Sequence, residues 1–126
     1  MKKKHQFDIF DAEDLKRVAA SGVEGTWSPP SNFPDLTQFD RIAIDLETRD
    51  PNLTRLGPGW CRDDGYVIGY AVAAGDFVGY YPVRHEGGGN ISEKKVVNWL
   101  KKQLATPHID KIMHNALYDL GWLRWA

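Results

Sequence analysis

The feature that most constrains the fold is a short stretch, residues 41–47, in which large apolar side chains occupy every second position. Asp45 and Glu47 occupy two of the alternate positions. Successive side chains of a β-strand point to opposite faces, so the pattern predicts a strand with one buried face and one face bearing both carboxylates. The carboxylates are then about 6–7 Å apart along the strand. The apolar positions between them are Ile42, Ile44 and Leu46.

Two carboxylates on one strand face repel each other, and the repulsion costs stability unless a cation neutralises it. Oxygen ligands of this kind suit Mg²⁺ or Mn²⁺. A solvated strand face with two acidic residues explains Asp45 and Glu47 equally well. The pair alone therefore leaves a metal site and a plain surface as equal alternatives.

The remaining elements predict an α/β fold. Two more strands, joined by a tight turn at Gly75-Asp76, continue an antiparallel meander, and a helix, a strand and a helix follow. Three strands, a helix, a strand and a helix form the opening part of a ribonuclease-H-like fold. Residues 48–65 are expected to form a long loop. The expected later elements are strands 66–74 and 77–82, helix 93–104 with Ser92 as its N-cap, strand 109–114 and helix 115–125.

The chain of 126 residues suits one modest domain, residues 41–126, preceded by an N-terminal segment, residues 1–40. That segment is expected to contain a short helix at 11–20 and a proline-rich connector that packs Trp27 and Phe33 on the domain. No run approaches the roughly 20 apolar residues of a membrane helix, so no membrane association is expected. A single cysteine, Cys61, fits a reducing cytoplasm. The net charge of −1 does not exclude a nucleic-acid substrate, because bound metal ions supply positive charge.

A second polar pattern follows the predicted strand 109–114. Asn115 and Asp119 are four residues apart and share one helix face, with Tyr118 beside them. Parallel strands bring their carboxyl ends together, which would place Asp119 near the carboxylates of strand 41–47. The alternative is that Asn115 only caps the helix and Asp119 is simply exposed.

Together the two patterns resemble the DEDD superfamily of 3′–5′ exonucleases. Ile-Ala-Ile-Asp-Leu-Glu-Thr at 42–48 is similar to its first motif, and His-Asn-Ala-Leu-Tyr-Asp at 114–119 is similar to its second. Within the superfamily the chain is most similar to proofreading domains of family A DNA polymerases, including the bacteriophage versions. The resemblance covers residues 40–126 and implies an enzyme of the cytoplasm, the host cytoplasm if the chain is of phage origin.

The resemblance implies a two-metal mechanism at the 3′ end of single-stranded DNA. Asp45, Glu47 and Asp119 would act as catalytic residues and hold two Mg²⁺ or Mn²⁺ ions. Asp45 would bridge the ions, Glu47 would bind the ion that carries the attacking water, and Asp119 would serve the other ion. The residues expected to contact the substrate are Thr48, Asn115 and Tyr118.

The superfamily's third motif, a Tyr or His about four residues before a last Asp, has no match in this sequence. His114 is expected to point away from the helix face that carries Asp119, and so not to replace it. The expected partners are therefore a polymerase domain or a complementary fragment that supplies the third motif. Self-association through apolar residues of helix 115–125 is a further expectation. The alternatives are an RNA-trimming exonuclease of the same superfamily and a non-catalytic module that binds nucleic acid or a partner.

Other conspicuous residues have simpler interpretations. His85 and the three glycines at 87–89 are expected to form a flexible surface loop, although an approach to a nucleotide backbone is the alternative. The four lysines of helix 93–104 are expected to be solvated. Trp99 and Trp125 are expected to pack in the interior, whereas Trp122 is equally suited to packing and to stacking on a base.

The missing third motif predicts weak or absent exonuclease activity for the chain alone. Loss of a residue that positions the nucleophile commonly lowers the rate ~10²–10⁴-fold, and a missing metal ligand adds to that loss. The measurement is release of mononucleotides from a 3′-labelled single strand in the presence of Mn²⁺. Robust turnover that disappears in Asp45→Ala would show that residues within this chain replace the third motif.

Overall fold

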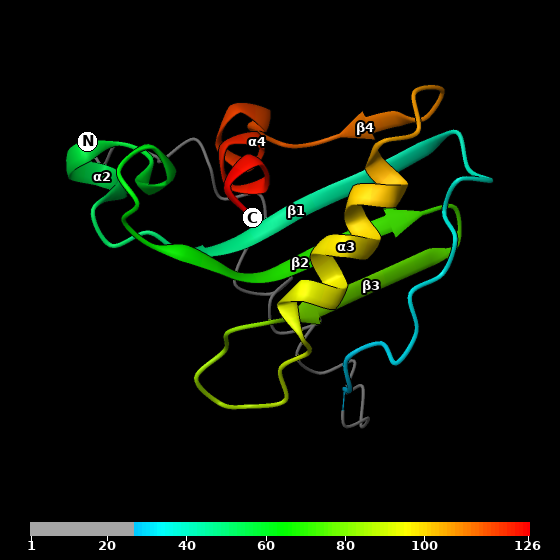
Figure 1. Cartoon of the computed structure of the whole chain (residues 1–126), viewed down its shortest axis with the longest axis horizontal. Helices are drawn as coiled ribbons and strands as arrows, with labels where there is room; N and C mark the ends of the chain where they lie inside the picture. The colour runs from blue at the N-terminus through cyan, green and yellow to red at the C-terminus, as the bar shows by residue number, and fades with distance from the viewer. Residues whose placement is uncertain (1–26) are drawn as a thin grey trace, which may run out of the picture.

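The structure is a computed structural model that describes residues 27–126. It is an α/β fold built on one mixed sheet with the strand order β3-β2-β1-β4 (Figure 1). β1 pairs antiparallel with β2, β2 pairs antiparallel with β3, and β4 runs parallel to β1. The arrangement is compatible with a ribonuclease-H-like fold. The strands are β1 (Arg41–Arg49), β2 (Tyr66–Ala74), β3 (Phe77–Pro82) and β4 (Asp110–Ile112).

Helices lie on one face of the sheet and at its edge. The long helix α3 (Glu93–Leu104) crosses the strands, and α4 (Ala116–Trp125) follows β4 (Figure 1). Two short helices, α2 (Leu53–Leu56) and η1 (Gly59–Cys61), occupy the segment expected to be a loop. The expected helix at 11–20 lies outside the described residues.

The core forms between α3 and one face of the sheet. The alternation in β1 is confirmed, because its apolar side chains are buried while Asp45 and Glu47 are exposed. α3 buries an apolar face against them, as amphipathic helices do. The main core side chains are Ile42, Ile44, Leu46, Tyr70, Val72, Tyr81, Val96 and Leu100.

The proline-rich connector completes this core. Phe33 stacks on Tyr81 with ring centroids 5.4 Å apart, and the Trp99 indole donates a 2.7 Å hydrogen bond to the Pro34 carbonyl. Leu36 is fully buried, and its backbone N–H donates to the side-chain oxygen of Gln103. The expected packing is therefore confirmed for Phe33. Trp27 contacts the Tyr80 ring, with ring centroids 6.0 Å apart, but its side chain remains largely exposed.

Two helix ends differ from simple caps. Ser92 occupies the N-cap position of α3, but its side chain makes no capping hydrogen bond; its carbonyl accepts from the backbone of Lys95 and Val96. Asn115 precedes α4 with a left-handed backbone, φ 53° and ψ 53°, and also makes no side-chain cap. The first backbone hydrogen bonds of these helices are therefore accepted by the carbonyls of Ser92 and Asn115, and no side chain caps either helix.

The apolar residues of α4 divide between the interior and the surface. Trp122 is buried and Leu123 packs against the core, while Leu117, Leu120 and Trp125 are exposed. Trp125 therefore does not pack in the interior as expected. Self-association through this helix stays a prediction, and only three of its five large apolar residues are available for it.

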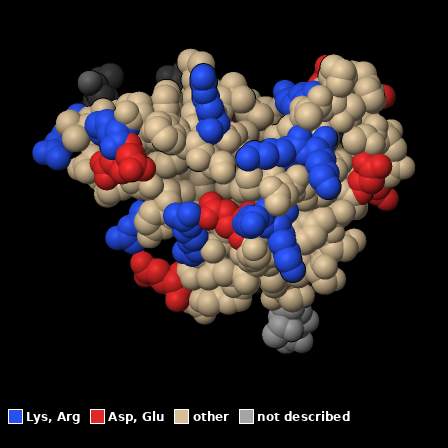
Figure 2. Space-filling model, in the orientation of Figure 1, with Lys and Arg blue, Asp and Glu red and all other residues tan. Residues whose placement is uncertain are grey.

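The surface over α3 is basic. Figure 2 shows Lys and Arg side chains gathered on the side of the molecule from which α3 is seen in Figure 1. The α3 lysines at positions 94, 95, 101 and 102 are all exposed, as expected for a solvated face. Within residues 27–126, no helix is long and apolar enough to cross a lipid bilayer.

Shortening a core residue under α3 should destabilise the fold. Leu100 is 2% exposed, so Leu100→Ala should lower the free energy of unfolding by about 2–5 kcal/mol through lost burial and the cavity left behind. Val78 lies on the opposite face and is 80% exposed, so Val78→Thr should change the free energy of unfolding by less than about 0.5 kcal/mol. Urea unfolding followed by tryptophan fluorescence measures both. Equal losses would mean that the core does not lie where the structure places it.

Candidate active site

The first two candidate residues lie on the sheet face opposite α3. Asp45 pairs with Ala71 and Glu47 pairs with Gly69 on β2, so their cross-strand neighbours on this face are small. Both carboxylates are exposed. The strand-face argument from the sequence is thereby confirmed, and the small neighbour of Asp45 leaves open space beside that carboxylate.

A shallow hollow lies beside Asp45 on the same face. Its lining combines small and apolar side chains of four strands with His114, which follows β4. A hollow of this shape can admit part of a ligand next to the carboxylates. The side chains that line it on this face are Ala43, Asp45, Ala71, Ala73, Val78, Ile112 and His114.

Asp119 is the third candidate and is only 3% exposed. Its Oδ2 atom is buried and has no hydrogen-bond partner. Burial, and then the negative charge of Asp45, raise the pKa of the Asp119 carboxyl, while the charge of His114 lowers it. Asp119 therefore lies within electrostatic reach of Asp45, although α4 and β1 are far apart in sequence.

His114 lies nearer to this site than the sequence suggested. It lines the same hollow as Asp45, and its charge acts on Asp119. The expectation placed His114 at the end of a strand spanning 109–114, directly before the helix. In fact β4 ends at Ile112 and α4 starts at Ala116, so His114 lies in the connection between them.

Tyr118 connects α4 to the end of β1. Its hydroxyl donates a 3.0 Å hydrogen bond to Asp50 Oδ2 and shares a 2.8 Å hydrogen bond with the Thr48 hydroxyl. Since the phenol proton is directed to Asp50, the Thr48 hydroxyl is the donor in the second bond. Thr48 and Tyr118, both expected to contact substrate, are therefore hydrogen-bonded to each other. Thr48 directly follows Glu47 in the chain.

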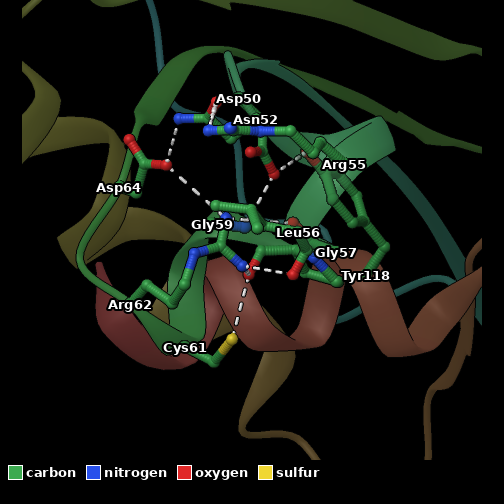
Figure 3. Close-up of polar contacts among 11 residues, drawn as sticks. Asp50, Asn52, Arg55, Leu56, Gly57, Gly59, Cys61, Arg62, Asp64 and Tyr118 are labelled. Carbon is green, nitrogen blue, oxygen red and sulfur yellow. Dashed lines mark hydrogen bonds and ion pairs between the residues drawn. The ribbon is translucent and has the colours of Figure 1, made fainter.

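Asp50 also organises the segment between β1 and β2, where Figure 3 shows the polar contacts. The Gly59 backbone N–H donates to Asp50 Oδ2 at 2.8 Å. The Arg62 guanidinium donates to the carbonyls of Leu56, Gly57 and Pro58 at 2.7–3.2 Å, which satisfies the carbonyl groups at the end of α2 and just after it. The expected loop at 48–65 is therefore a folded unit held by side-chain to backbone hydrogen bonds.

This unit packs directly on α4. The Trp60 ring of η1 lies against Gly121, where an added Cβ would be 2.2 Å from the ring. A larger residue at 121 would push the two helices apart. Gly121 and the Tyr118–Asp50 bond thus fix α4, and Asp119 on it, relative to β1. Asn115, the remaining candidate, is exposed and makes no cap.

Within residues 27–126, no group of three or more His, Cys, Asp or Glu side chains lies close enough to hold a metal ion. The gathering of all three carboxylates around a metal pair therefore stays a prediction. The individual donors nevertheless fit a hard cation. All are carboxylate oxygens, Asp119 Oδ2 is unpartnered, and the repulsion between Asp45 and Asp119 is of the kind that a cation relieves.

Sequence reasoning missed several residues around the site. Asp50 lies just after the first motif, and its role depends on Gly59 and Tyr118, which are distant in sequence. Tyr80, which was also missed, shares a 2.5 Å hydrogen bond with His85, which was expected to lie in a flexible surface loop. The only signal for Tyr80 in the sequence was its place on a predicted strand, which does not reveal its neighbours.

Comparison with known proteins relates the chain to a DNA polymerase. No protein-family model matches it. It is 41% identical over 105 residues to a protein of Pseudomonas phage M6 named as a DNA-directed DNA polymerase. The match covers 80% of this chain, and the chain spans 16% of that protein's length. The chain is therefore related to one segment of a phage DNA polymerase.

The raised pKa of Asp119 predicts how stability depends on pH. A carboxyl whose pKa is higher in the folded state stabilises the fold most at low pH, and that contribution is lost as pH rises through the folded-state pKa. In metal-free buffer, Asp119→Asn should therefore unfold at a higher temperature than wild type at pH 7. The difference should vanish below the unfolded Asp pKa of about 4.

Calorimetric scans across this pH range measure the effect, with Asp76→Asn in the exposed β2–β3 turn as the matched control. The control should follow wild type at every pH. An Asp119→Asn protein that is less stable than wild type at pH 7 would contradict the expectation that the ionised Asp119 carboxylate destabilises the fold.

Proposed function

We propose that this chain is part of a 3′–5′ exonuclease domain associated with a DNA polymerase. It would hydrolyse terminal phosphodiesters of single-stranded DNA with Mg²⁺ or Mn²⁺ held by Asp45, Glu47 and Asp119. The observation that carries the proposal is Asp119. A buried carboxylate with an unpartnered oxygen and a like-charged neighbour costs stability, and a cation at that place offsets the cost.

The relation to a phage DNA polymerase supports the same proposal. Polymerases act on DNA ends, and a carboxylate-held metal site is suited to phosphodiester chemistry. The open hollow beside Asp45 suits a flexible single strand better than a deep pocket for a small molecule would. We further propose that the partner is the rest of such a polymerase and that the chain acts in the host cytoplasm.

The residues of the chain have distinct tasks in this mechanism. Two bound divalent ions would supply an activated water and stabilise the attacking and leaving oxygens. Asp45 and Glu47 would provide oxygens from β1 in the sheet, and Asp119 would provide them from α4. Tyr118 holds α4 against the end of β1 through its hydrogen bonds to Thr48 and Asp50. Asn115 is exposed at the start of α4 and free to contact the substrate strand.

A second candidate function is a non-catalytic module that binds a protein partner. It is favoured by the exposed apolar side chains on α4, where Leu117 is 82% exposed and Trp125 is 63% exposed. Apolar side chains grouped on one surface often mark an interface. Metal binding distinguishes the candidates, because this second function does not require it.

The proposal predicts specific Mn²⁺ binding that depends on Asp45. Wild type should take up Mn²⁺, and Asp45→Asn should lose this binding. The variant should keep its fold, because Asp45 is exposed and its replacement removes the repulsion between neighbouring carboxylates. Electron paramagnetic resonance of free Mn²⁺ during titration measures uptake, and circular dichroism verifies the fold. Asp110→Asn, an exposed acid on β4, is the matched control and should bind like wild type.

The substrate is tested on the same proteins with 5′-labelled single-stranded DNA and RNA of one sequence. Shortening of DNA from its 3′ end, slow but absent in Asp45→Asn, supports the proposed polarity and sugar preference. Faster shortening of RNA would favour the RNA-trimming alternative. Absence of Mn²⁺ uptake by the wild type would overturn the exonuclease proposal and leave the non-catalytic module.

A further inference from the structure

Tyr80 lies on the open face of the sheet, in line with Asp45. The strand pairing places Asp45 opposite Ala71, and Ala71 opposite Tyr80. Directly paired residues point to the same side of a sheet. Tyr80 therefore shares the face of the two carboxylates, whereas its neighbour Tyr81 is buried in the core beneath α3.

The Tyr80 side chain crosses β2 above Gly69. A Cβ added at Gly69 would be 2.0 Å from the Tyr80 hydroxyl oxygen, so this hydroxyl takes the place of the missing side chain. Gly69 is paired with Glu47, and the Cβ positions of paired residues are about 4.5–5.5 Å apart. The atoms of Glu47 beyond its Cβ can bridge most of that distance. The Glu47 carboxylate is thus within reach of the Tyr80 hydroxyl.

Electrostatics agree with this placement. Burial first, and then the negative charge of Glu47, raise the pKa of the Tyr80 phenol. The first cause reflects the packing of the ring on the sheet. The second agrees with the Gly69 geometry, which by itself places the phenol above the residue that pairs with Glu47.

His85 holds the Tyr80 hydroxyl from the other side. Its Nε2 atom is 2.5 Å from the phenol oxygen. The His85 backbone is itself fixed, because its N–H donates to Asn90 Oδ1 at 2.7 Å and its carbonyl accepts from Asn90 Nδ2 at 2.8 Å. The side chain of Asn90 thus closes the glycine loop expected to be merely flexible, and His85 is held at its base.

We propose that Tyr80 is a positioning residue for Glu47, oriented by His85. His85 Nε2–H donates to the Tyr80 oxygen, and the Tyr80 O–H donates to the Glu47 carboxylate. This order requires the His85 tautomer with its proton on Nε2, because an unprotonated Nε2 would draw the phenol proton away from Glu47. The inference rests on the proposed function, in which Glu47 is a metal ligand. Hydrogen-bonded partners of metal ligands orient the ligands and commonly change metal affinity 10–100-fold.

The proposed hydrogen bond between Tyr80 and Glu47 is tested without metal. Tyrosine labelled with ¹³C at Cζ gives one NMR signal for each phenol, and alkaline titration reports the pKa of Tyr80. Glu47→Gln should lower this pKa, because it removes the nearby negative charge, whereas Glu86→Gln in the neighbouring loop should not. An unchanged Tyr80 pKa in Glu47→Gln would overturn the inference, whether or not the chain binds metal. Circular dichroism confirms that the protein remains folded during titration.

The positioning role is tested by Mn²⁺ affinity. Tyr80→Phe should weaken Mn²⁺ binding about 10-fold, and Gly69→Ala should do the same because its methyl group displaces the phenol. Tyr81→Phe is the matched control, because that hydroxyl donates to the Asn32 carbonyl away from this face, and it should bind like wild type. His85→Gln retains a donor and should bind better than His85→Ala.

The outcomes separate this inference from the proposed function. If wild type binds Mn²⁺ in an Asp45-dependent way but Tyr80→Phe binds equally well, the positioning role is wrong and the exonuclease proposal stands. If wild type takes up no Mn²⁺, the exonuclease proposal fails and the positioning role fails with it. The phenol titration then shows whether Tyr80 and Glu47 still make contact as a structural pair.

Discussion

The structure depends on the pairing of β1 with a neighbour on each side. β2 and β4 fix its position, and its two faces then have opposite environments. The face bearing Ile42 and Ile44 closes the core under α3, and the face bearing Asp45 and Glu47 stays open. A slip of one residue would bury both carboxylates and expose the core. The burial that stabilises the fold therefore also determines where the acidic residues lie.

The α4 helix is placed by interactions that are more polar and more local than the core. Tyr118 bonds Thr48 and Asp50, and Gly121 permits close contact with Trp60. These contacts bring Asp119 to Asp45 at a cost in electrostatic repulsion. Groups with perturbed pKa values are common at functional sites because binding and catalysis require such strained charges. The folded segment between β1 and β2 is thus the support that holds Asp119 in an unfavourable place.

Much of the fold could be predicted from the sequence because its signals are local. The alternation in β1 and the amphipathic pattern of α3 are confirmed, and the bounds of β2, β3 and α3 agree with the structure. The segment 48–65 could not be predicted, because its order comes from Asp50 and Arg62 bonding to backbone groups that no periodicity marks. The placement of His114 and Tyr80 likewise depends on the ends of elements and on cross-strand pairing.

The open face explains why β2 has small residues where β1 has acids. Ala71 faces Asp45, and a larger residue there would fill the hollow beside that carboxylate, while Gly69 faces Glu47. Glycine in a strand interior normally weakens the strand, so its presence indicates a close approach by another group. At Gly69 that group is the phenol of Tyr80, which brings a hydroxyl from β3 across β2 toward β1. Because Gly69 has no side chain, Tyr80 on β3 places its hydroxyl over the β2 residue that pairs with Glu47 of β1.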